Sequence, residues 1–243
     1  LHYKYSYYFY NNIMIKAIFF DVFGTLVDWR TSLIENITNN QILEERNQII
    51  EEFVINWRLE YQPILNQVNK KNSPWMILDD LHAITLNTVL KKMKIVYLSY
   101  ENKIELVNMW HRLNPWKDTQ KSLKSLGKKY ITSSLSNGNI ELQKKLIKYA
   151  NLEFNFIISA ENFKKYKPAL AVYLGASNSI NISPEKCLMV ASHKQDLKAA
   201  RKVGFKTAFI SRKNEYGRFS YKFPKVVFTP DITLNSLDDL EES

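Results

Sequence analysis

The stretch KAIFFDVFGTLVD, residues 16–28, decides the fold of this chain. It begins with a short apolar run that is rich in strand-favouring residues, as is typical of a buried β-strand. Asp21 follows this run directly, and Gly24 marks a turn after it. A buried strand that ends in a carboxylate and a glycine-containing turn predicts the first strand of an α/β sheet.

Strands and helices alternate along the second half of the chain. The pattern predicts strands at residues 128–136, 154–159, 187–192, 207–211 and 226–229, with helices at 139–149, 169–179 and 195–203. Alternation of this kind is typical of a parallel sheet with helices on both faces, and the strand at residues 15–20 completes it. The predicted fold class is therefore α/β, with a Rossmann-like parallel sheet as the core.

The segment between these two parts has a different character. Apolar residues recur there at helical spacing, as at Ile42, Ile49, Phe53 and Trp57. We therefore predict an inserted all-helical cap at residues 30–114 and a discontinuous core made of residues 14–29 and 115–243. Residues 1–13 are rich in tyrosine without a clear period, and we expect a loose extension there, ahead of a natural start at Met14.

The composition excludes several classes of protein. Hydrophobic residues make up 45% of the 243 residues, which is enough for a core and excludes general disorder. Cys187 is the single cysteine, so no internal disulfide can form. No apolar run approaches the ~20 residues of a membrane helix, and the start of the chain lacks the features of a signal peptide. We expect a cytoplasmic protein with no membrane partner.

The net charge is +10, from 34 Lys and Arg against 24 Asp and Glu. Most of the positive charge is lysine spread along the chain in pairs, without an arginine-rich arm or zinc-finger spacing. This distribution predicts a solvated surface and no nucleic-acid partner. A positive field can still attract small anions to a cleft.

Polar residues that follow the predicted strands are the candidates for chemistry, because ligands bind at the carboxyl ends of parallel strands. Asp21 follows the first strand, Ser136 and Asn137 follow the second, Lys167 lies beyond the third, and Asp196 follows the fourth. A carboxylate beside a lysine that keeps it ionised is typical of a nucleophile.

These residues resemble the four motifs of the haloacid dehalogenase superfamily in order and spacing: Asp21 with Gly24 and Thr25, Ser136 with Asn137, Lys167 before Pro168, and Asp196. The stretches WRLEYQP (57–63), WHRLNPW (110–116), YKPALAVY (166–173) and FISRKNEYG (209–217) resemble its type II (S)-2-haloacid dehalogenase branch. The resemblance covers the chain from residue 14 onward.

Two positions separate the chemistries found in this superfamily. Phosphatases carry a second aspartate two residues after the nucleophile, where this chain has Phe23. They also bind magnesium through an acidic pair at the fourth motif, where this chain has Ser192 and Asp196. The resemblance therefore implies a hydrolase without metal or cofactor. A magnesium-dependent small-molecule phosphatase and a non-catalytic member that binds an anion or a partner remain alternatives.

The resemblance implies a mechanism with an aspartyl ester. Asp21 would displace the halide from C2 of an (S)-2-haloalkanoic acid, and water would then hydrolyse the ester to an (R)-2-hydroxy acid. Lys167 would keep Asp21 anionic, and Asp196 would orient Lys167 and help to activate the water. Thr25 and Ser136 would hydrogen-bond the nucleophile and the substrate carboxylate.

The resemblance also implies a set of residues that bind a small anionic substrate. Arg58 matches the arginine that guides the substrate and receives the halide, although an ion pair with Glu51 or Glu60 is an alternative. Asn137 would contact the halide beside the apolar Phe23. Tyr173 resembles an active-site tyrosine, with packing as the alternative reading. Dimers are common in this branch, which leaves a homodimer possible.

The fourth motif departs from the better-known dehalogenases. This chain has Ala191, His193 and Gln195 where those enzymes often have a serine, an asparagine and an aromatic residue. His193 is therefore a candidate general base near neutral pH, or a substitute hydrogen-bonding residue.

Overall fold

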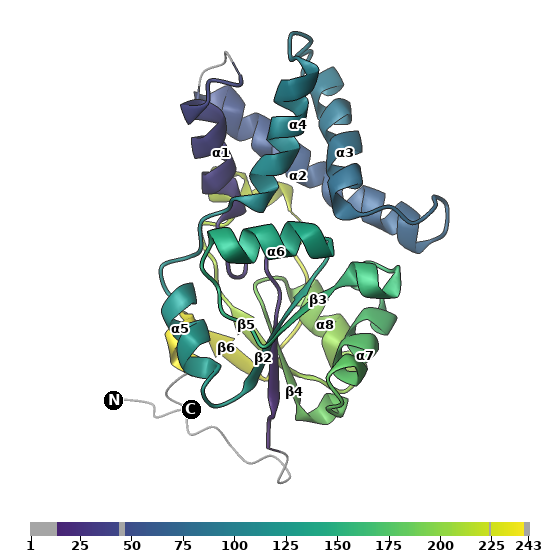
Figure 1. Cartoon of the computed structure of the whole chain (residues 1–243), viewed down its shortest axis with the longest axis vertical. Helices are drawn as coiled ribbons and strands as arrows, with labels where there is room; N and C mark the ends of the chain where they lie inside the picture. Colours follow the sequence, from purple (N-terminus) through teal and green to yellow (C-terminus); the bar gives the residue numbers. More distant parts are fainter. Residues whose placement is uncertain (1–13, 44–46, 224, 241–243) are drawn as a thin grey trace.

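A six-stranded parallel sheet forms the lower layer of the molecule in Figure 1. The structure is a computed structural model that describes residues 14–43, 47–223 and 225–240. The predicted extension at residues 1–13 lies outside the described residues. The strands are β1 (Ala17–Phe20), β2 (Ile131–Ser136), β3 (Phe156–Ser159), β4 (Cys187–Ala191), β5 (Lys206–Ile210) and β6 (Ile232–Leu234). Their order across the sheet is β3-β2-β1-β4-β5-β6, so the predicted parallel α/β core is confirmed.

The central strand β1 is buried on both faces, which explains its unbroken apolar sequence. Side chains alternate between the two faces of a strand. Ile18 and Phe20 pack into one hydrophobic cluster, and Ala17 and Phe19 pack into the other. β1 pairs with β2 on one side and with β4 on the other.

Four helices cover the two faces of the sheet. On one face lie α5 (Thr119–Leu126) and α6 (Ile140–Tyr149), and on the other lie α7 (Leu170–Ser179) and α8 (Lys194–Lys202). Leu123 of α5 and Leu146 of α6 belong to the same cluster as Phe20. Val172 of α7 and Leu197 of α8 belong to the cluster of Phe19. The sheet is therefore a buried layer between two pairs of helices.

The predicted last strand at residues 226–229 is wrong. These residues are not in a strand, and the sixth strand is Ile232–Leu234. Asp231 sets the register, because its carboxylate accepts hydrogen bonds from the backbone N–H and the hydroxyl of Thr207 in β5. The apolar run that suggested the earlier strand leaves Val227 93% exposed.

A layer of helices lies above the edge where β1 ends (Figure 1). It contains α1 (Trp29–Asn39), α2 (Asn47–Asn69), α3 (Leu78–Lys92) and α4 (Tyr100–Asn108), which pack on one another in chain order. None of the helices in the described part of the chain is both long and apolar enough to cross a membrane.

Two crossing segments, residues 21–28 and 112–118, join the helical layer to the sheet. They are hydrogen-bonded to each other: Asp28 N–H donates to the carbonyl of Asn114 at 2.9 Å, and Trp116 N–H donates to the carbonyl of Leu26 at 3.0 Å. The segment that leaves the sheet and the segment that returns to it therefore lie side by side, close to Asp21.

Candidate active site

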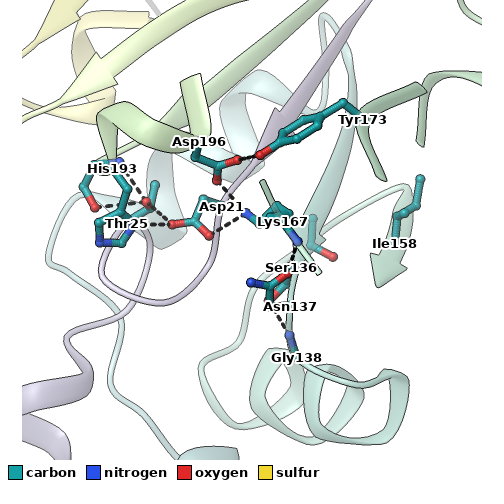
Figure 2. Close-up of polar contacts among 12 residues, drawn as sticks. Asp21, Thr25, Ser136, Asn137, Gly138, Ile158, Lys167, Tyr173, His193 and Asp196 are labelled. Atoms are coloured by element: carbon teal, nitrogen blue, oxygen red, sulfur yellow. Dashed lines mark hydrogen bonds and ion pairs between the residues drawn. The ribbon is translucent and has the colours of Figure 1, made fainter. Parts of the chain in front are cut away.

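Lys167 links two carboxylates at the carboxyl edge of the sheet (Figure 2). Its Nζ lies 2.8 Å from Oδ1 of Asp21, which directly follows β1. The same Nζ lies 2.6 Å from Oδ2 of Asp196, which lies in the first turn of α8 after β4. All three side chains are less than 10% exposed. Residues far apart in the sequence thus meet because parallel strands end at one edge.

The buried ammonium and carboxylates set one another's protonation. Burial alone would raise the pKa of Asp21, but the Lys167 ammonium and His193 outweigh it and hold that pKa well below its usual range. Burial alone would lower the pKa of Lys167, but Asp196 and Asp21 keep it above its usual range. Asp21 is therefore an anion at neutral pH.

Both oxygens of the Asp196 carboxylate hold a donor. Oδ2 accepts from Lys167, and Oδ1 accepts from the hydroxyl of Tyr173 in α7 (Figure 2). Burial raises the pKa of Asp196, and the nearby charge of Asp21 adds to this, while Lys167 opposes it. Burial and Asp196 together raise the pKa of Tyr173, so its hydroxyl stays protonated and donates. Asp196 thus anchors Lys167 and Tyr173.

The turn after β1 brings Thr25 back to Asp21. The Thr25 hydroxyl donates to Oδ2 of Asp21 at 2.8 Å and accepts from the backbone N–H of Ser192 at 2.9 Å. Gly24 has φ +84° in this turn, and a Cβ there would lie 2.1 Å from Oε1 of Glu215. Only glycine therefore fits both the backbone conformation and the space.

His193 lies between two carboxylates. Its Nδ1 is 3.0 Å from Oδ2 of Asp21, and its Nε2 is 2.9 Å from Oε1 of Glu215. Burial alone would lower the pKa of His193, but Glu215, Tyr216 and Asp21 outweigh it and raise that pKa well above its usual range. The imidazole is therefore protonated when both neighbouring carboxylates are ionised.

Glu215 is the site residue that the sequence reasoning missed. It is 2% exposed and also accepts a hydrogen bond from the Trp29 indole N–H at 3.0 Å. Burial alone would raise its pKa, but His193 outweighs the burial and lowers it, so Glu215 is an anion. Glu215 lies in the loop after β5, which ends at Ile210. Its only signal in the sequence is its place after a strand, in the stretch FISRKNEYG (209–217).

Ser136 is the last residue of β2, and Asn137, which follows it, supports Lys167. Oδ1 of Asn137 accepts from the backbone N–H of Lys167 at 2.8 Å. The Ser136 hydroxyl accepts from the backbone N–H of Gly138 at 3.0 Å. Ser136 thus bonds within its own loop and not to Asp21, and contact with a substrate carboxylate stays a prediction for it.

Arg58 of α2 lies among aromatic rings. Its guanidinium carbon is 4.1 Å from the centre of the Tyr61 ring and 5.4 Å from that of Trp29. Its Nη1 is buried and has no hydrogen-bond partner among the described residues. The alternative ion pairs are not formed, because Glu51 pairs with Arg30 and Arg218, and Glu60 pairs with Lys92.

Phe23 closes the apolar side of the site. It is 3% exposed and meets Trp110 edge to face, with ring centres 5.9 Å apart. Trp110 also stacks on Trp29 at 6.2 Å. The position that carries a second aspartate in phosphatases is therefore occupied by a buried ring between the sheet and the helical layer.

Comparisons with known proteins agree with this geometry. The family model for haloacid dehalogenase-like hydrolases matches residues 15–204. The (S)-2-haloacid dehalogenase 4A of Burkholderia cepacia is 28% identical over 236 residues, which are 93% of each chain.

Two solved structures are similar over nearly the whole chain. The L-2-haloacid dehalogenase PA0810 is 36% identical with a TM-score of 0.87, over 93% of this chain and 98% of that one. The defluorinating L-2-haloacid dehalogenase Rha0230 is 31% identical with a TM-score of 0.85, over 93% and 94% of the two chains. By its sequence motifs, its fold and the family match, this chain belongs to the haloacid dehalogenase-like hydrolases.

Proposed function

We propose that this protein hydrolyses (S)-2-haloalkanoic acids to (R)-2-hydroxy acids through an aspartyl ester. The observation that carries the proposal is the buried Asp21 carboxylate, held anionic by Lys167 at the end of β1. The similar enzymes are named as dehalogenases of 2-haloacids, which supports the same substrate class here.

The first step is a displacement at carbon. A carboxylate oxygen of Asp21 attacks C2 of the substrate, the carbon–halogen bond breaks, and the halide leaves with the bonding electrons. Attack from the side opposite the halide inverts C2. A halide needs no proton to leave, which agrees with the apolar Phe23 two residues after the nucleophile.

The second step is hydrolysis of the ester. Water attacks the carbonyl carbon of the Asp21 ester, and the oxyanion that develops lies within reach of Lys167, whose ammonium stabilises it. Collapse of this intermediate breaks the ester bond and releases the hydroxy acid. Asp21 is then a carboxylate again.

Arg58 is the candidate partner for the anionic groups of substrate and product. Its buried Nη1 has no hydrogen-bond acceptor among the described residues. A buried donor without an acceptor costs free energy of folding. A halide or a carboxylate would supply that acceptor. We propose that the site is also lined by three residues of the sheet layer, Ser136, Asn137 and Tyr173.

The helical layer at residues 30–114 is proposed to act as a cap on a core of residues 14–29 and 115–243. The aromatic contacts of Phe23, Trp29 and Trp110 fill the space between the layers, which favours exclusion of water during the displacement. The paired crossing segments are the proposed hinge.

The donor set speaks against magnesium-dependent phosphoryl transfer. The Lys167 ammonium already bridges the two carboxylates that would hold a cation, and Ser192 stands where a further acidic ligand would be needed. A metal-free reaction is therefore proposed. A homodimer and a cytoplasmic location stay predictions.

The test is chloride release from (S)-2-chloropropionate by purified protein in the presence of EDTA. We expect turnover in the native protein and none in Asp21→Asn, with (R)-lactate as the product. Chloride release that persists in Asp21→Asn would contradict the covalent mechanism. No release from any 2-haloacid, together with phosphate release in the presence of magnesium, would favour the phosphatase alternative.

A further inference from the structure

We propose that Asn69 of the helical layer positions Lys167 through Tyr166, so that the layer above the sheet holds the lysine against the nucleophile. Tyr166 immediately precedes Lys167 in the chain. Asn69 and Tyr166 are positioning residues, because they act on the reaction through the lysine. This inference rests on the proposed function, in which Lys167 serves both chemical steps.

Tyr166 is held by the helical layer through every polar group that it carries. Its backbone N–H donates to Oδ1 of Asn69 at 2.9 Å, and its carbonyl accepts from Nδ2 of Asn69 at 2.8 Å. Its hydroxyl donates to the carbonyl of Met76 at 2.7 Å. Asn69 is the last residue of α2, and Met76 lies between α2 and α3. These three hydrogen bonds form the Tyr166 contact.

Packing adds to the Tyr166 contact. Trp75 stacks on the Tyr166 ring, with ring centres 4.6 Å apart and an angle of 27° between the planes. Tyr166 is 0% exposed. The neighbouring Lys165 donates from Nζ to the carbonyl of Asn69 at 3.1 Å. Because a buried amide or hydroxyl that loses its partner costs free energy, the Tyr166 backbone is expected to follow residues 69–76 when they shift.

The Tyr166 contact fixes the backbone from which the Lys167 side chain extends. The next N–H in the chain, that of Lys167 itself, donates to Oδ1 of Asn137 at 2.8 Å. The two successive amides are therefore anchored in different layers, the first by Asn69 in the helical layer and the second by Asn137 in the sheet layer. A shift of either anchor moves the Lys167 Nζ relative to Asp21, which it meets at 2.8 Å (Figure 2).

The contact ties the chemistry to the position of the helical layer. The Lys167 ammonium holds Asp21 anionic for the displacement and stabilises the oxyanion during hydrolysis of the ester. Misplacement of a catalytic group by about 1 Å can slow a reaction about 10²-fold. A helical layer that moves away from the sheet takes residues 69–76 with it and pulls on Tyr166. The lysine is thus fully effective only while the helical layer covers the site.

The test compares Asn69→Ala with the native protein in chloride release from (S)-2-chloropropionate. This variant loses both hydrogen bonds to the Tyr166 backbone, and we expect kcat to fall about 10- to 100-fold while KM changes less than about threefold. Asn69→Gln carries the same amide group on a longer side chain and is expected to recover part of kcat. Tyr166→Phe loses only the bond to Met76, and a smaller fall in kcat is expected.

A matched control is a second asparagine that joins the two layers. Asn139, which precedes α6, donates from Nδ2 to Oδ2 of Asp79 at 3.0 Å and accepts from the Asp79 N–H at 3.3 Å. Asn139→Ala removes the same kind of two-way contact at a place that does not adjoin Lys167. We expect its kcat to stay within about threefold of the native value. Thermal unfolding of every variant measures how far each contact stabilises the fold.

A measurement on the unaltered protein keeps the proposal open to refutation if the variants fail to fold. Amide hydrogen exchange, followed by NMR at single residues, gives the free energy of opening for the N–H groups of Tyr166 and Lys167. If the Tyr166 contact holds the lysine, the two N–H groups open together and show equal protection. Markedly stronger protection of the Lys167 N–H would show that its backbone stays in place when the contact opens, and would overturn the proposal.

The kinetic outcomes have distinct meanings. A rise in KM with unchanged kcat in Asn69→Ala, or no change in either constant, would overturn the positioning role while leaving the proposed function intact. An equal fall of kcat in Asn69→Ala and Asn139→Ala would indicate general loosening of the two layers and would also overturn it. No chloride from the native protein with any 2-haloacid would overturn the proposed function, and the positioning role with it.

Discussion

Three buried carboxylates share the site, and each has a cation beside it. Lys167 serves both Asp21 and Asp196, and the His193 imidazolium serves both Asp21 and Glu215. Arg58 adds a further positive charge that lowers the pKa of Glu215. Because buried charges are costly unless they are paired, these side chains form a unit in which no member can be removed alone without affecting the others.

The depressed pKa of Asp21 makes stability depend on pH. Its folded-state pKa lies below the unfolded value of about 3.9, so its contribution to stability is complete above that value and is lost as the pH falls. Compared with Asp21→Asn, the native protein should lose about 1 kcal/mol of unfolding free energy between about pH 7 and pH 3. Urea unfolding at a series of pH values measures this difference. A constant difference would show that Asp21 is not held anionic by the fold.

Most residues around Asp21 were predictable because they follow a strand in the sequence. Asp21, Lys167 and Asp196 each come after a strand, and parallel strands bring such positions together whatever their separation along the chain. Glu215 also follows a strand, five residues beyond the end of β5, but it belongs to none of the four motifs that single out Asp21, Lys167 and Asp196. Its role depends on the path of that loop back to His193, which local sequence patterns do not encode.

At the scale of elements, the turn after β1 is constrained by its own backbone conformation and by contacts with residues far away in the sequence. Its glycine has a positive φ, its threonine bonds the nucleophile, and Glu215 from a distant loop packs against its backbone. The turn therefore connects β1 to the loop after β5 through its contact with Glu215. The predicted strand at residues 226–229 was wrong for a related reason. An apolar run favours a strand, but the hydrogen bond from Thr207 to Asp231 determines where the chain pairs with β5.

Gly24→Ala tests the contact between this turn and Glu215. The new Cβ would combine a left-handed backbone with a position 2.1 Å from Glu215, and we expect a loss of about 1–3 kcal/mol of stability together with slower turnover. Gly204→Ala is the control, since that residue also has a positive φ but its Cβ would meet Pro184 only at 3.4 Å. Urea unfolding and chloride release measure both effects. Equal loss of activity in the two variants would contradict a specific effect on Glu215.

At the scale of the whole molecule, the proposed site for a small anion lies between the two layers, and the chain as a whole carries a net charge of +10. Long-range attraction of an anionic substrate does not require the lysines to touch it, because the summed field acts at a distance and is screened by salt. We therefore expect the scattered lysines of the sequence to contribute to capture of the proposed substrate.

This field predicts a salt dependence of the reaction. The kcat/KM for (S)-2-chloropropionate should fall a few-fold as the ionic strength rises from about 0.01 M to about 0.5 M, with kcat much less affected. The uncharged 2-chloropropionamide serves as the comparison substrate, and its kcat/KM should change little. Parallel changes for both substrates would indicate a general effect of salt on the enzyme in place of electrostatic attraction.

The position of β1 in the sheet has a consequence for synthesis on the ribosome. β1 is translated first among the strands, yet its neighbours β2 and β4 begin only at residues 131 and 187. For most of translation, the nascent chain therefore holds an apolar strand without partners, and the site is complete only after Glu215 has left the exit tunnel. Such long-range pairing slows folding and exposes apolar segments to aggregation. Yield of this protein in cells should accordingly depend on chaperones that protect its first twenty or so described residues until the rest of the sheet arrives.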